Sequence, residues 1–161
     1  MTPLVPVFPQ SLIPLGWDVL TLLSATIFLE AEGESDEGKV AVGWVIRNRS
    51  DLWKQELSKV MLAPQQFSCW NKGYAPLALT RLTQARGPAL VACWRAAAGA
   101  LWRLIPDPTG GAVHYLNIEA TKAGRPAHDL PPWAGTATDP FHADPERVTA
   151  VIGNHTFLSA P

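Results

Sequence analysis

An apolar segment without a single charged side chain constrains the fold more than any other feature of the chain. It covers residues 19–29 and is bounded by Asp18 and Glu30. Pro14, Gly16 and Asp18 interrupt the apolar residues on its N-terminal side, so the stretch is too broken for a transmembrane helix. Its apolar residues recur at helical spacing, and Asp18 is a suitable N-cap. The segment therefore predicts a buried or amphipathic helix that ends near Glu30.

The composition predicts one folded domain. The chain has 161 residues, of which 47% are hydrophobic and 17% charged. The charged fraction is below the roughly 25% of average domains. The high hydrophobic and low charged fractions together exclude disorder as the main state. Thirteen basic and fourteen acidic residues leave a net charge of −1, which argues against a nucleic-acid partner and a polybasic membrane anchor. Two cysteines, Cys69 and Cys93, are too few for a zinc cluster. The sequence allows either one disulfide between the two cysteines or two free thiols.

Periodicity predicts an α+β fold that is mostly helical with a small β element. Residues 1–16, with four prolines, are expected to form an N-terminal arm, and residues 17–161 the domain. Further helices are predicted over residues 36–50, 53–61, 77–86 and 88–104, and short strands over 112–116, 148–152 and 156–158. Residues 65–71 are expected to be a polar and aromatic loop or hairpin, and the proline-rich residues 118–147 a long irregular segment.

Acidic residues cluster directly after the first predicted helix, where five of the fourteen fall between positions 30 and 37. Asp36 and Glu37 suit the N-terminal dipole of the second helix. Glu30 instead ends an apolar face, where desolvation and neighbouring carboxylates favour the protonated form. Glu30 is therefore a candidate general acid, the group needed to cleave a glycosidic bond. Glu34 is the candidate second carboxylate of a hydrolase, although Gly33 interrupts the helix between them.

Five motifs occur in the order found in one known family. The first motif begins at Glu30 and comprises E-A-E-G-E-S at 30–35, E-G-K-V-A-V-G at 37–43 and N-R at 48–49. The later motifs are Q-F-S-C-W-N at 66–71, D-P-T-G-G-A at 107–112, P-W at 132–133 and I-G-N-H-T-F at 152–157. Together they resemble the SleB-type cell-wall hydrolases, which are spore-cortex-lytic enzymes and related phage and bacterial peptidoglycan hydrolases. The resemblance implies a lysozyme-like, lytic-transglycosylase-type catalytic domain over residues 17–161 that acts on the MurNAc–GlcNAc glycan.

The resemblance also implies a mechanism that needs neither a cofactor nor a metal. Glu30 corresponds to the family's catalytic acid, which protonates the glycosidic oxygen. The resulting carboxylate then takes the proton of the muramic C6 hydroxyl, and a 1,6-anhydro sugar forms. No second carboxylate is required, which favours a structural role for Glu34, capping a loop or accepting from backbone amides. Glu34 is also kept as a candidate substrate-binding residue.

The remaining candidate substrate-binding residues are polar or aromatic: Gln66, Phe67, Ser68, Trp70, His114, Tyr115, Asn117 and Trp133. The first four belong to a loop that either lines a glycan groove or is pinned to the core by its two aromatic side chains. Tyr115 and Asn117 follow a turn and suit hydrogen bonds to sugar hydroxyls or N-acetyl groups. Trp133, after two prolines, is the best candidate for stacking on a sugar ring. His155 is expected to be structural.

Three other functions remain open. The first is a cysteine peptidase that cuts peptide stems, with Cys69 as nucleophile and His114 or His155 as base. The second is a zinc amidase using the four histidines at positions 114, 128, 142 and 155, although no H-x-H or H-E-x-x-H pair is present. The third is a non-catalytic glycan-binding module built on the seven tryptophans.

The expected partner is the glycan strand of bacterial peptidoglycan, bound by a monomer without stable membrane insertion. Residues 1–10 carry no Lys or Arg, so the basic region of a secretory signal is not expected. The spore enzymes of the family carry a signal peptide and a separate peptidoglycan-binding domain, neither of which is recognised here. We therefore expect synthesis in the bacterial or host cytoplasm without Sec export. Such a protein fits a phage endolysin released by a holin, a virion component or a prophage hydrolase.

Overall fold

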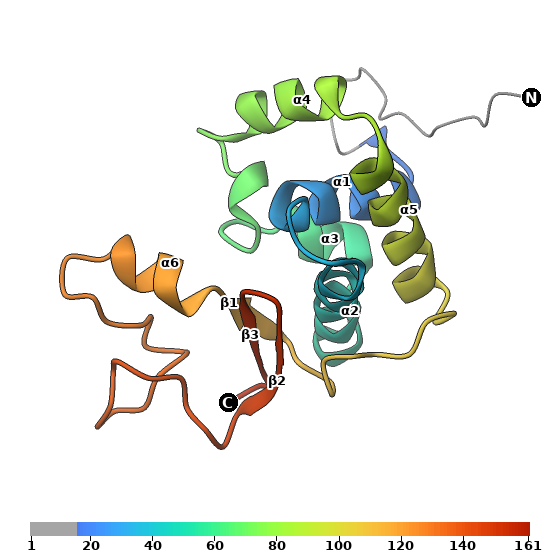
Figure 1. Ribbon diagram of the computed structural model, residues 1–161. Helices are drawn as coiled ribbons and strands as arrows, with labels where there is room; N and C mark the ends of the chain where they lie inside the picture. Colours follow the sequence, from blue (N-terminus) through green and yellow to red (C-terminus); the bar gives the residue numbers. More distant parts are fainter. Residues whose placement is uncertain (1–15) are drawn as a thin grey trace, which may run out of the picture.

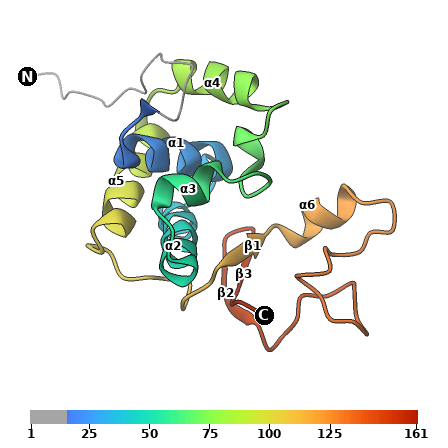
Figure 2. The same ribbon diagram turned by 180° about the vertical axis from the view of Figure 1, so that it is seen from behind.

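The computed structural model describes residues 16–161, so the arm predicted for residues 1–16 lies, except for Gly16, outside the described residues. Helices α1–α5 form one part of the molecule, and the strands with α6 lie to one side of it (Figure 1, Figure 2). The first part contains α1 (Val19–Ala31), α2 (Asp36–Trp53), α3 (Leu57–Leu62), the 3₁₀ helix η2 (Ser68–Trp70), α4 (Ala75–Gln84) and α5 (Pro88–Leu101). The second contains β1 (His114–Leu116), α6 (Ile118–Ala123), β2 (Val148–Ile152) and β3 (His155–Leu158).

Helix α1 is the central element of the helical part. Its N-cap is Asp18, whose Oδ1 accepts a hydrogen bond of 3.0 Å from the backbone N–H of Thr21. Every residue from Thr21 to Phe28 is buried, because α2, α3, α4 and α5 all contact the helix. Such a helix is apolar on all sides, as buried helices are. Its last turn carries Glu30, which is thereby held at the edge of the core.

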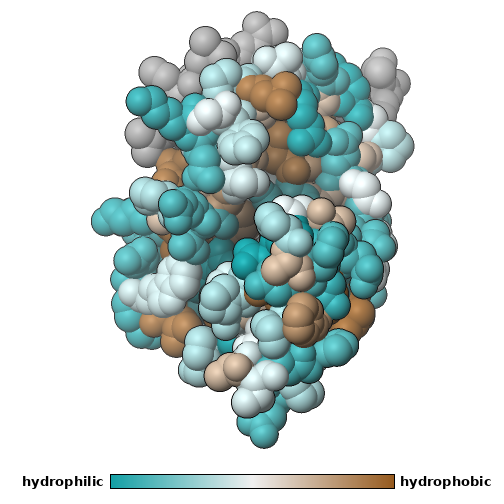
Figure 3. Space-filling model, turned by 90° about the vertical axis from the view of Figure 1, so that its left-hand side faces the viewer, coloured by the Kyte–Doolittle hydropathy of each residue, from teal (hydrophilic) through white to brown (hydrophobic). Residues whose placement is uncertain are grey.

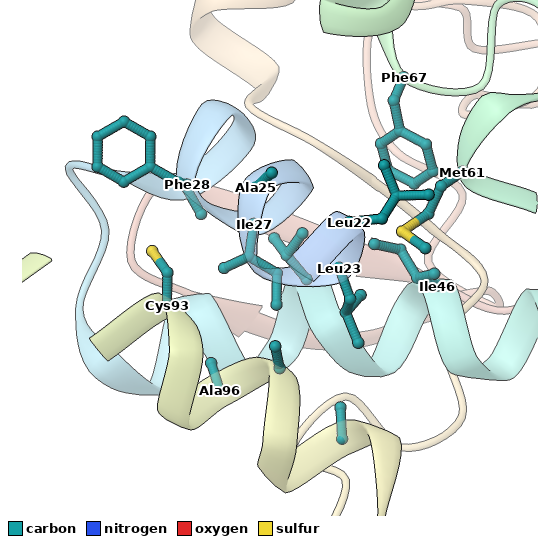
Figure 4. Close-up of a cluster of buried hydrophobic side chains, with 14 of the residues drawn as sticks. Leu22, Leu23, Ala25, Ile27, Phe28, Ile46, Met61, Phe67, Cys93 and Ala96 are labelled. Carbon is teal, nitrogen blue, oxygen red and sulfur yellow. The ribbon is translucent and has the colours of Figure 1, made fainter. Parts of the chain in front are cut away.

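Small residues bring α1, α2 and α5 close together. A Cβ atom on Gly43 would lie 3.1 Å from the side chains of both Ala100 and Ile27, so glycine is what permits this approach. On α5, Ala96 and Ala97 are at most 1% exposed. Figure 4 shows the side chains of α1 packed beside Ile46 of α2, Met61 of α3 and the small Cys93 and Ala96 of α5. The close packing fixes the direction in which α1 presents its C-terminal turn.

The sheet joins the helical part through α2. Its strand order is β1-β3-β2, antiparallel throughout, with Tyr115 opposite Phe157. Ala41 and Val45 of α2 share a core cluster with Phe157 and Ile152. Asn48 in the N-R motif donates to Asp107 Oδ2 and to the carbonyl oxygen of Ala112, both at 3.0 Å. These contacts hold β1 across α2 and place its side chains near the end of α1.

The structure confirms the α+β class and most of the predicted elements. Helix α2 continues to Trp53 and ends at Lys54, which adopts a left-handed conformation, so the third helix begins only at Leu57. Residues 65–71 contain the 3₁₀ turn η2 and no hairpin. The segment predicted as irregular contains the short helix α6, with Asn117 as its N-cap. Within residues 16–161, no helix combines the length and the hydrophobicity needed to cross a membrane.

Candidate active site

Glu30 lines a pocket of about 210 Å³ at the C-terminal end of α1. Ser68 and Cys69 of η2 form another part of the wall, and α4 supplies Leu77 and Arg81. Figure 3 views the molecule from the side of α4 and α6, and this face is hollowed between its upper and lower parts. Among the described residues, Glu30 is the only carboxylate that lines this pocket. The site therefore presents a single carboxyl group for acid–base chemistry.

Tyr115 of β1 holds the Glu30 carboxyl group. Its hydroxyl donates a hydrogen bond of 3.0 Å to Oε2 of Glu30. Burial, and then the neighbouring Glu30 charge, raise the pKa of Tyr115 well above its usual value, so the phenol stays protonated and acts as a donor. The ring packs at 5.0 Å from the His155 ring and at 5.8 Å from the Phe157 ring, measured between centroids. Tyr115 was predicted to contact sugar, and the structure places its hydroxyl on Glu30.

Arg49 is a buried cation near this pair that the sequence analysis did not select. Its Nε donates to the carbonyl oxygen of Val113 at 2.6 Å, and its Nη1 donates to Gln66 Oε1 at 3.3 Å. The guanidinium lies 5.2 Å from the centroid of the Phe67 ring. Burial lowers the pKa of Arg49, whereas Tyr115 and Glu30 oppose that effect. A charged residue one helical turn after the buried Val45 and Ile46 of α2 was the available signal for this role.

The loop after α3 is fixed to α1 by its aromatic side chains. Trp70 Nε1 donates to Thr26 Oγ1 at 3.0 Å. Phe67 is 2% exposed and belongs to the main core cluster, which favours the alternative that its side chain pins the loop to the core over contact with substrate. Gln66 is bound to Arg49. Of the four candidates from this loop, Ser68 lines the pocket of Glu30.

Cys69 also lines the pocket, beside Glu30. Burial is the main cause that raises the pKa of its thiol far above the usual value, and the Glu30 charge adds to it. Burial likewise raises the pKa of Cys93 to about 12. Both cysteines are free thiols. A cysteine peptidase needs an activated thiolate, and the surroundings of Cys69 oppose its formation.

Glu34 contacts the turn between β2 and β3. Its Oε2 accepts from the backbone N–H of Asn154 at 3.4 Å, and its Oε1 accepts from the Asn154 side chain at 3.3 Å. The backbone oxygen of Glu34 accepts a hydrogen bond from Lys39 Nζ. Glu34 does not line the pocket of Glu30. These bonds support the structural role and place the Glu34 carboxylate outside the pocket.

The candidates on the sheet side lie outside this pocket. His114 stacks on Trp133 with ring centroids 5.0 Å apart, and Trp133 is 38% exposed. Burial, with the charges of Arg49 and Arg147, lowers the pKa of His114 to about 4. Asn117 uses its side-chain oxygen to cap α6. The Trp133 side chain is therefore partly accessible to a ligand such as a sugar ring, whereas the side-chain oxygen of Asn117 already accepts a hydrogen bond within the protein.

The histidines do not gather into a metal site in the described part of the chain. Within residues 16–161, no group of three His, Cys, Asp or Glu side chains is arranged to hold a metal ion. The rings of His114 and His155 pack instead against Trp133 and Tyr115, respectively. Residues 16–161 therefore do not provide the ligand set that a zinc amidase would need.

Comparisons with known proteins give the family and the fold of the chain. Residues 33–158 match the model of a family described as cell wall hydrolase; the match begins just after Glu30. The catalytic domain of the germination-specific lytic transglycosylase SleB from Bacillus anthracis has a similar structure, with a TM-score of 0.59 and 22% identity over 91% of this chain and all of that one. The SleB catalytic domain from Bacillus cereus is also similar, with a TM-score of 0.55 and 24% identity over 94% of this chain and 98% of that one. No curated protein sequence matches the chain significantly. The likeness confirms the predicted fold.

Proposed function

The chain belongs to the cell wall hydrolase family, and from this we propose that it cleaves the MurNAc–GlcNAc bond of peptidoglycan with Glu30 as the catalytic acid. One observation carries the proposal. Among the described residues, Glu30 is the single carboxylate in its pocket, and a tyrosine hydroxyl holds it in place. A positioned carboxyl group of this kind can give a proton to a leaving oxygen and later take one back.

The reaction proceeds in two proton transfers at the same carboxyl group. Glu30 first protonates the glycosidic oxygen, and the bond from that oxygen to muramic C1 breaks. The Glu30 carboxylate then accepts the proton of the muramic C6 hydroxyl as O6 bonds to C1. The products are a free hydroxyl on the leaving sugar and a 1,6-anhydro-muramic end, so no water is consumed. Tyr115 holds Oε2 throughout and fixes the orientation of the group.

The positions of the neighbouring carboxylates favour transglycosylation over hydrolysis. A hydrolase uses a second carboxylate at roughly 5 to 9.5 Å from the acid to direct or replace a water molecule. Glu34 is engaged with Asn154, and Glu32 forms an ion pair with Arg81. The similar domain from Bacillus anthracis is described as a lytic transglycosylase, which supports the same reaction here.

Product masses test this proposal. Purified peptidoglycan is digested with the protein, and the soluble muropeptides are measured by mass spectrometry beside those from lysozyme. We expect products lighter than the lysozyme products by one water. Reducing muramic ends would contradict the transglycosylase reaction and make Glu34 the first candidate for a second carboxylate. Free stem peptides with intact glycan would contradict the glycosidase and favour Cys69.

For the biological setting, we propose a monomeric phage or prophage cell-wall hydrolase. It is made in the cytoplasm of the bacterial host and reaches the wall after holin-type release or within a virion. The motifs support this setting because the SleB-type family that they resemble includes phage hydrolases. Expression with and without a holin tests it: rapid lysis is expected only in the presence of the holin, and equal lysis in both would contradict the release step. Light scattering after size exclusion tests the monomer.

A further inference from the structure

Arg81 is the one cationic side chain that lines the pocket of Glu30 among the described residues. It lies on α4, and it also lines a second pocket of about 280 Å³ together with Glu32, Gln84 and Arg86. Arg81 therefore stands where the two pockets adjoin. In the first pocket it has an apolar neighbour on the same helix, Leu77, which is 62% exposed. This wall combines a positive charge with accessible apolar surface.

The ion pair of Arg81 with Glu32 lies at the surface and occupies one nitrogen of the guanidinium. Arg81 Nη2 lies 2.9 Å from Glu32 Oε2, and the two side chains are 45% and 46% exposed. Exposed ion pairs of this kind contribute little to stability. A guanidinium also carries five N–H donors in a planar fork, so one carboxylate does not saturate it. A second carboxylate from a ligand can therefore bind Arg81 without a large loss of protein contacts.

Peptidoglycan supplies such a ligand beside the sugar that reacts. Muramic acid carries a peptide stem on its lactyl group, and the stem contains free carboxylates and small apolar side chains. A muramic residue placed at Glu30 therefore brings its stem close to the pocket walls. Guanidinium groups bind carboxylates through paired, charge-assisted hydrogen bonds.

We propose that Arg81 binds a carboxylate of the peptide stem and thereby makes the enzyme prefer glycan strands that bear stems. The inference rests on the proposed function, because it places muramic acid at Glu30. Arg81 is a specificity residue in this account: it contacts the stem and takes no part in the proton transfers. Its loss weakens binding of strands with stems and leaves stem-free strands unaffected.

Equilibrium binding tests the inference without relying on turnover. Soluble glycan strands are prepared with stems and without them; the stem-free strands are made by amidase treatment, after which the lactyl carboxylates that the amidase exposes are converted to amides. Both kinds of strand are titrated into the Glu30→Gln protein with or without Arg81→Ala. We expect Arg81→Ala to raise the Kd for stem-bearing strands about tenfold, the loss typical of a hydrogen bond to a charged group. The Kd for stem-free strands should stay the same. Arg95→Ala, which removes an equal charge from the exposed side of α5, is the matched control and should change neither value.

An unchanged Kd for stem-bearing strands, or equal losses on both kinds of strand, would overturn the role of Arg81. The proposed function is tested separately by the wild-type protein. Glycan left uncut by it would contradict the glycosidase, whereas the binding difference reports on Arg81 alone.

Discussion

The hydroxyl of Tyr115 donates a hydrogen bond of 3.0 Å to the carboxylate of Glu30, although 85 positions separate the two residues in the chain. Two rigid elements meet at this bond. Glu30 ends the buried helix α1, and Tyr115 lies on β1, which pairs with β3. Neither element alone fixes the direction of the carboxyl group. The bond therefore links the packing of the sheet on α2 to the geometry of the acid.

Tyr115→Phe should lower kcat about tenfold and change KM less than twofold. The substitution keeps the ring among His155 and Phe157 but removes the donor that orients the acid, and hydrogen bonds to charged groups contribute about 1.5–3 kcal/mol. Initial rates on soluble glycan strands measure both constants, and the thermal midpoint verifies folding. An unchanged kcat in a folded variant would show that the bond has no part in catalysis.

Both thiols should be unreactive in the native protein at pH 8. Burial keeps the pKa of Cys69 far above its usual value and that of Cys93 at about 12, so little thiolate exists at that pH. A thiol titration should count both groups in guanidinium and react slowly without it. Cys69→Ala should keep at least about a third of the wild-type rate, because the proposed reaction uses no thiol nucleophile. A complete loss of activity in that folded variant would support the peptidase alternative.

Mild acid should destabilise the protein, partly through His114. Its pKa of about 4 in the folded state lies below the usual 6.5, so the unfolded chain binds the proton first as the pH falls. Stability from this group is therefore complete above the unfolded pKa and is lost as the pH falls toward 4. Between pH 7.5 and pH 5 we expect up to about 2 kcal/mol less free energy of unfolding.

Urea denaturation at the two pH values measures this change. Burial also lowers the pKa of His155, which contributes in the same direction. His114→Gln should lose less stability than the wild type over the same range, because the variant lacks one of the two groups. An equal loss in both proteins would contradict the assignment to His114.

The position of Glu30 could be predicted from the sequence because the signals are local. Asp18 and Ser35 cap the first two helices, and the uncharged segment between Asp18 and Glu30 shows which helix is buried. Apolar periodicity and caps of this kind act within a few residues. They were enough to place one carboxyl group at the edge of the core.

The partners of Glu30 could not be predicted in the same way. Tyr115 contacts Glu30 only because β1 packs on α2, and Arg49 is near this pair through its position on α2. No local pattern encodes either placement. The burial of the Phe67 side chain could not be predicted either, because a loop without periodicity does not show which aromatic side chain faces the core. Helix α6 is six residues long, too short for periodicity to separate it from the prolines around it.

The most direct test of the account compares Glu30→Gln with Glu34→Gln. The two substitutions are chemically identical and four positions apart, and the structure places the first carboxylate in the pocket and the second on Asn154. The rate at which soluble muropeptides are released from purified peptidoglycan is measured for both, with thermal unfolding as the check of folding. We expect Glu30→Gln to lose at least the roughly 10²–10⁴-fold that a general acid contributes, and Glu34→Gln to stay within about threefold of the wild type. Near-wild-type release by folded Glu30→Gln would contradict the central claim.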